Sequence, residues 1–173
     1  MTDKSYSLGA GEKVSQVMIG TPNLLVWGDL LTKERVSIAG FMNTLAEAYV
    51  PLHDANILFL TPAEKTAPVT RPVVYVKLEE ILLLFEVGAS QPPPEETKVR
   101  RLEPLEALIG SYQIEGSLFK SPIATLQNML LVAKDAYLPL YKATIRHVAK
   151  PWLGTFSADL VQIRRDRLIV AVR

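Results

Sequence analysis

The chain has 173 residues, of which 49% are hydrophobic and 21% are charged, so it is long enough for one domain or two small ones and its composition predicts a folded core. Its 19 basic and 18 acidic side chains nearly cancel, which excludes a strongly basic surface over the whole chain. The absence of cysteine excludes disulfides, thiolate nucleophiles and cysteine-ligated metal sites.

The first nine residues carry no apolar run behind Lys4, so we expect no signal peptide. The most apolar run, residues 81–85, is far shorter than the roughly 20 residues that span a bilayer. These two features predict a cytoplasmic protein without a membrane span.

An internal repeat organises the sequence. A shift of 88 residues (116 − 28) places Gly28 on Gly116 and brings eight identities into the 32 positions from 26 to 57. A shift of 87 then brings residues 74–83 onto residues 161–170, and a single-residue change of length in a loop is typical of duplication followed by drift. We therefore predict two tandem copies of one module. The identities fall at Gly28, Leu30, Ala48, Tyr49, Pro51, Leu52, Ala55 and Ile57.

Within each copy the pattern predicts a fixed order of elements. An extended hairpin comes first, over residues 14–31 in the first copy, with a turn at residues 20–23. A short helix follows, then a strand that begins near Pro51, and finally a closing hairpin. This hairpin turns at residues 78–80 in the first copy and at residues 165–167 in the second. The helix is predicted from apolar residues at helical spacing, which are Ile38, Phe41, Met42 and Leu45 in one copy and Leu126, Met129, Leu130 and Ala133 in the other.

The fold class expected from this order is a β-rich α+β fold. It consists of two tandem copies of a small bent sheet or partly open barrel, related by a pseudo-two-fold, each with about five strands and one short helix. The modules are expected at residues 13–88 and 104–173, with a proline-rich connector at residues 89–103. Because a copy of about 70 residues is marginal alone, the two should share a core or pack tightly.

No residue pattern predicts catalysis. His53 and His147 stand outside any metal-ligand spacing, and each aligns with an aromatic residue of the other copy, which favours a packing or surface role. No nucleotide-binding, nucleophile or metalloprotease motif occurs. We therefore predict a protein that is not an enzyme and that uses no cofactor or metal. Tyr49 and Tyr137 could line a cleft in each copy or serve as core tyrosines at the helix-to-strand corner, and the second interpretation is favoured.

Charge separates the two copies. Residues 1–89 carry 7 basic and 10 acidic side chains, whereas residues 104–173 carry 9 and 5. At the closing turn, residues 77–80 of the first copy, which include Glu79 and Glu80, align with residues 164–167, and the turn changes from net acidic to a net basic set. We predict that these oppositely charged ends form protein–protein contacts, with copies of the chain or within a larger complex. The basic set consists of Arg164, Arg165 and Arg167. The apolar run at residues 81–85 is expected to lie under the sister module, with an intermolecular interface as the alternative.

The basic second copy also suggests an alternative function, the binding of single-stranded RNA or DNA, because an aromatic residue lies among cations there. The candidate residues are Lys142, Arg146, His147, Lys150, Trp152, Arg164, Arg165, Arg167 and Arg173.

Two resemblances follow from these motifs. A V/I-x-G-x-L strand, a short helix and an A-Y-x-P-L-x-x-A segment together resemble an uncharacterised bacterial family of small domains of unknown function, over most of each copy. Residues 161–170 also resemble the closing hairpin of Sm-like small β-barrels, with Arg165 in place of a glycine and a helix that departs from the Sm order. The first resemblance implies no activity. The second implies small, strongly bent sheets and ring assembly.

Overall fold

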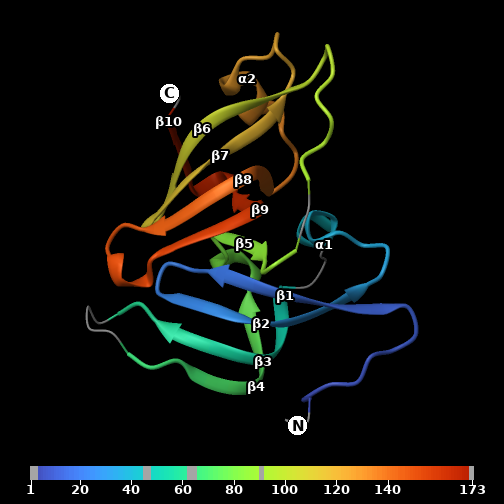
Figure 1. The fold of residues 1–173 in the computed structure, drawn as a ribbon, viewed down its shortest axis with the longest axis vertical. Helices are drawn as coiled ribbons and strands as arrows, with labels where there is room; N and C mark the ends of the chain where they lie inside the picture. Colours follow the sequence, from blue (N-terminus) through green and yellow to red (C-terminus); the bar gives the residue numbers. More distant parts are fainter. Residues whose placement is uncertain (1–3, 45–47, 62–65, 90–91, 172–173) are drawn as a thin grey trace. The chain divides into compact units, whose positions relative to one another are not determined.

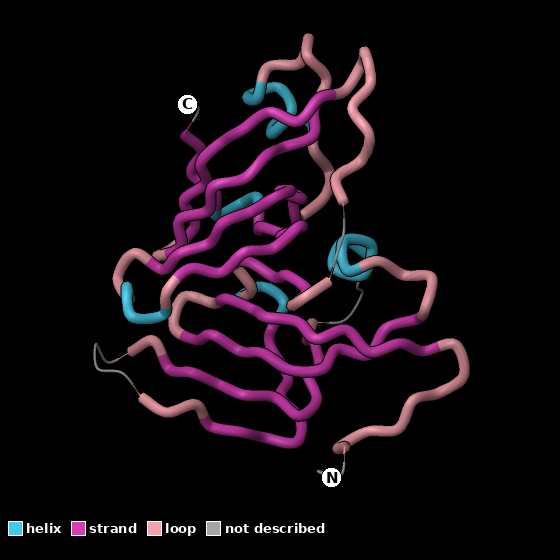
Figure 2. The backbone as a smooth tube through the Cα atoms, viewed as in Figure 1, coloured by secondary structure: helices cyan, strands magenta, loops and turns pink. Residues whose placement is uncertain are grey.

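The computed structural model describes residues 4–44, 48–61, 66–89 and 92–171. The chain divides into two compact units, residues 1–88 and residues 89–173. Strands dominate both units and the helices are short (Figure 1, Figure 2). The expectation of a β-rich fold with short helices is therefore confirmed.

Unit 1 is an antiparallel sheet in the strand order β5-β1-β2-β3-β4. Its fifth strand pairs antiparallel with the first. The elements are β1 (Glu12–Gly20), β2 (Leu24–Lys33), α1 (Ile38–Thr44), β3 (Tyr49–Phe59), β4 (Val69–Lys77), the 3₁₀ helix η1 (Leu78–Glu80) and β5 (Leu83–Glu86). The predicted helix position Leu45 lies outside the described residues.

Unit 2 is an antiparallel sheet in the order β10-β6-β7-β8-β9. Strand β6 begins at Arg101, within the range expected for the connector. The elements are β6 (Arg101–Ile109), β7 (Tyr112–Lys120), α2 (Leu126–Val132), β8 (Tyr137–His147), the 3₁₀ helix η2 (Pro151–Leu153), β9 (Thr155–Arg164), the 3₁₀ helix η3 (Arg165–Arg167) and β10 (Leu168–Ala171).

A β-bulge interrupts the second strand of each unit at a glycine. The register shifts between Trp27 and Asp29 in unit 1, on either side of Gly28, and around Gly116 in unit 2. A Cβ atom on Gly28 would lie 2.7 Å from the carbonyl oxygen of His53, so only glycine fits there without a shift of the backbone. Bulges of this kind bend a strand and increase its local twist.

The core of each unit consists of the alternating inward residues of its strands. In unit 1 these include Val17, Ile19 and Leu30, and in unit 2 Ile114 and Ile145, all of them buried. The apolar run at residues 81–85 is buried along its whole length, as expected from its lack of alternation. That run is therefore not available to a partner as exposed surface. No helix in the described part of the chain is long and apolar enough to cross a membrane.

Candidate functional site

The closing turn of unit 1 gathers two exposed tyrosines beside two glutamates. Tyr49 opens β3 opposite Lys77, and Tyr75 lies two residues before Lys77 on β4. Because cross-strand partners and alternate residues share one face of a sheet, both tyrosines lie on the same face, with 47% and 68% of their surface exposed. Glu79 and Glu80 follow in η1 and are exposed. We call this set, Tyr49, Tyr75, Glu79 and Glu80, the acidic end.

One of the two glutamates has a local partner. The ammonium of Lys77 donates a hydrogen bond to the Glu79 carboxylate, and this bond raises the pKa of Lys77. The charges of Lys77 and Glu79 cancel within the turn, so Glu80 supplies the net negative charge of the acidic end.

The closing turn of unit 2 repeats this local pair with arginine and aspartate. Arg164 Nε donates to Asp166 Oδ1 at 2.8 Å, and this bond lowers the pKa of Asp166. The Arg164 guanidinium also lies over the Tyr137 ring, 6.0 Å from its centroid. Arg167 is exposed and leaves the turn with a net positive charge.

Arg165 has a structural task that the sequence pattern does not indicate. Its guanidinium donates to the carbonyl oxygen of Leu130 at 3.1 Å and also to that of Ala133. Leu130 lies in the last turn of α2 and Ala133 is its C-cap residue, and backbone acceptors at a helix end have no partner inside the helix. Arg165 thus fixes the end of α2 against η3, so the exposed apolar residues of α2 and the charged closing turn lie side by side although they are far apart in sequence.

Helix α2 is apolar, and none of its residues is buried. Five of the seven residues of α2, LQNMLLV, are apolar. Leu131 and Val132 are 73% and 74% exposed. Thr125 caps the first turn, since its hydroxyl accepts a hydrogen bond from the Asn128 amide at 3.2 Å. We call Leu131, Val132, Arg165 and Arg167 the basic end.

Sequence reasoning predicted this helix but did not single out Leu131 or Val132. The signal was present in the succession Leu130, Leu131 and Val132, because three consecutive apolar residues cover more than one face of a helix and cannot all turn inward.

Of the other predicted basic residues, Arg173 lies outside the described residues, and two lie at the end of β9 away from η3. Arg146 and Lys150 stand around the β8–β9 turn with Trp152, and the nine-residue advance from Thr155 to Arg164 separates them from η3 by roughly 30 Å. Lys150 is buried, whereas Arg146 is exposed and donates through Nε to Gln113 Oε1 at 2.8 Å. Lys142 is exposed within β8 and has a left-handed φ of 52°. The structure therefore divides the predicted basic set into two separate groups.

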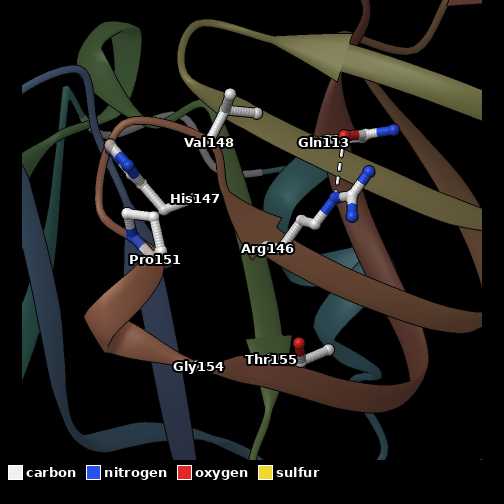
Figure 3. A pocket seen from close by; sticks show the side chains of 7 residues that line it. All are labelled: Gln113, Arg146, His147, Val148, Pro151, Gly154 and Thr155. Atoms are coloured by element: carbon white, nitrogen blue, oxygen red, sulfur yellow. Dashed lines mark hydrogen bonds between the residues drawn. The ribbon is translucent and has the colours of Figure 1, made fainter.

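A hollow of about 340 Å³ lies at this turn (Figure 3). Arg146 and His147 leave β8 in different directions, so they do not converge on one point (Figure 3). Burial and the neighbouring charge of Lys150 lower the pKa of His147, and its Nδ1 has no hydrogen-bond partner among the described residues. The hollow is lined by Gln113, Arg146, His147, Val148, Pro151, Gly154 and Thr155.

The two repeated tyrosines occupy different environments. Tyr49 is exposed, as described above, whereas Tyr137 is only 1% exposed and its burial raises its pKa to about 12. Tyr137 thus lies in the core at the helix-to-strand corner, whereas Tyr49 lies at the surface.

Within the described ranges, no group of three or more His, Cys, Asp or Glu side chains is arranged to hold a metal ion. Comparison of the chain with models of protein families, with curated proteins and with solved structures found no match.

Proposed function

We propose that this chain is a non-enzymatic, internally duplicated assembly module. In the assembly, the basic end of one chain binds the acidic end of the next chain. The observation that carries the proposal is helix α2, an apolar helix with no buried residue that Arg165 holds in place. An exposed apolar helix beside fixed positive charge is typical of a protein-binding surface rather than of a core element.

The two ends are complementary in chemistry as well as in sign. Leu131 and Val132 offer apolar area to Tyr49 and Tyr75, and Arg167 meets the unbalanced charge of Glu80. Arginine above a tyrosine ring adds a cation–π attraction. Because the two ends differ, their contact is head to tail, and contacts of this kind close into rings or extend into filaments.

The duplication itself is also a proposal, and three structural features at one spacing support it. Strands β3 and β8 both have 11 residues and begin 88 apart (137 − 49), and helices α1 and α2 both have seven residues and begin 88 apart (126 − 38). The left-handed residues Asp54 and Lys142 are also separated by 88 (142 − 54). The return of the fifth strand beside the first in each unit supports the partly open barrel.

The proposal is tested by sedimentation velocity at low salt over a range of protein concentrations. The parent chain should associate as concentration rises, and the Leu131→Gln/Val132→Gln variant should need at least tenfold more protein to do so. Val99→Gln is the matched control, because Val99 is 69% exposed but lies outside both ends. A parent chain that stays monomeric would refute self-assembly. A gel shift of single-stranded RNA by that monomer would favour the nucleic-acid alternative instead.

A further inference from the structure

A buried carboxylate sits at the bulge of unit 1 and is bound by a segment from outside the sheet. Asp29 is buried and accepts hydrogen bonds from Lys4 Nζ at 2.5 Å and from Tyr6 Oη at 2.7 Å. Burial alone would raise the pKa of Asp29, but the hydrogen bonds from Lys4 and Tyr6 outweigh it and the pKa is lowered. Asp29 is therefore an ionised group whose cationic partner comes from residues 4–6, which we call the strap.

The strap also contacts the next two strands. The backbone amide of Ser5 donates to Asp54 Oδ1 on β3 at 3.3 Å, and the Ser5 hydroxyl donates to the carbonyl oxygen of Pro72 on β4 at 2.8 Å. The Tyr6 ring meets the His53 ring edge-on, with centroids 5.1 Å apart. The strap belongs to no strand. It thus lies on the sheet as an extended peptide ligand would, held by side chains and one backbone amide.

The site is larger than the strap that fills it. A hollow of about 470 Å³ lies beside Lys4 and is lined by Trp27, Met18 and Asn56 among others. Lys4 Nζ is also 4.0 Å from Asp54 Oδ2, so one ammonium faces two carboxylates. Lys4, Asp29 and Asp54 together carry a net charge of −1.

The fold does not require these residues. At the spacing of 88, Asp29 corresponds to Ser117 and Asp54 to Lys142, both at the same bulge in unit 2. His53 likewise corresponds to Tyr141. Since unit 2 forms the same bulge without either carboxylate, the acidic pair and its strap are an addition of unit 1 rather than part of its framework.

We propose that the strap occupies a recognition site for an extended peptide carrying a lysine and, two residues later, a tyrosine, and that the strap of a second copy takes its place. Exchange of an identical segment between copies links them at little cost, because the hydrogen bonds that the strap makes within one chain are made again between two chains. This exchange uses neither the acidic nor the basic end, so it stands independently of head-to-tail assembly.

The test uses the full chain with its strap detached by Lys4→Ala and Tyr6→Ala. Trp27 lines the hollow and reports on it by fluorescence, once Trp152 is replaced by phenylalanine. A synthetic peptide of residues 1–9 should change Trp27 emission in a saturable way. The same peptide with alanine at positions 4 and 6 should bind at least tenfold more weakly, as should the natural peptide on a chain that also carries Asp29→Asn.

Equal responses to the two peptides, or no saturable response from a folded variant, would overturn the proposal. If the double variant does not fold, Lys4→Ala alone is titrated with the peptide and with n-butylammonium chloride, and the melting temperature is compared with that in sodium chloride. A rise in melting temperature with both the peptide and n-butylammonium that disappears in the Asp29→Asn variant supports the proposal. A rise with butylammonium only assigns the site to free amines and overturns peptide exchange, and no rise with either ligand also overturns it.

Discussion

The two bulge glycines provide a matched pair of substitutions. Gly28→Ala places a Cβ atom 2.7 Å from the carbonyl oxygen of His53 and 3.0 Å from the Cα atom of Ala55. Both contacts are with backbone, so no side-chain rotation relieves them. Gly116→Ala places its Cβ 3.3 Å from the carbonyl oxygen of Tyr141, which a shift of a few tenths of an ångström accommodates.

The expected costs differ accordingly. Overpacking that forces the backbone to move typically costs about 1–3 kcal/mol, and Gly28→Ala should fall in that range. Alanine restricts the unfolded chain more than glycine does, which stabilises both variants by about 0.4–1 kcal/mol and offsets the small strain at Gly116. The free energy of unfolding should therefore change by less than about 1 kcal/mol there, leaving a difference of roughly 2 kcal/mol between the two variants.

Each unit contains its own reporter for this experiment. Trp27 precedes Gly28 in unit 1 and Trp152 lies in unit 2. Urea unfolding is followed by fluorescence in two backgrounds, Trp152→Phe for the first variant and Trp27→Phe for the second. A cost at Gly116 equal to or larger than that at Gly28 would refute the reasoning from close backbone approach.

Three further predictions concern unit 2. Burial lowers the pKa of the His147 imidazole below its ordinary value of 6.5. As pH falls, the imidazole is therefore protonated in the unfolded chain before it is protonated in the folded chain. The contribution of His147 to the free energy of unfolding should fall as pH drops below about 6.5 and stay constant above it. Urea unfolding at several pH values should show that His147→Phe removes this slope, and an unchanged slope would contradict the assignment. Arg165→Met should speed amide hydrogen exchange in α2 because the last carbonyls of the helix lose their donor, whereas Arg167→Met should leave that exchange unchanged. Thr125→Ala should destabilise the first turn of α2 by about 1 kcal/mol, seen as faster exchange at Asn128, and Thr125→Ser should retain the cap.

The β-rich class and both short helices follow from local pattern. Proline and glycine mark the turns, apolar residues recur at helical spacing around Met42 and Met129, and the uninterrupted apolar run at residues 81–85 predicts a strand buried on both faces. These are short-range signals, and the structure of each unit agrees with them.

The surfaces could not be predicted in the same way. Charge counts selected Arg164, Arg165 and Arg167 as one basic group, but a count carries no information about partners. Arg164 is paired with Asp166, and Arg165 caps a helix that ends 33 residues earlier (165 − 132). The strap was missed for a related reason, since nothing in the sequence near Lys4 indicates a partner 25 residues away.

Exchange of charge between Glu80 and Arg167 tests head-to-tail assembly most directly, with sedimentation velocity at low salt as the measurement. Glu80→Arg and Arg167→Glu should each weaken self-association several-fold, because each places like charges across the contact. A mixture of the two variants should associate again, since the arginine introduced in one chain then meets the glutamate introduced in the other. Unchanged association in the single variants, or no recovery in the mixture, would contradict head-to-tail assembly.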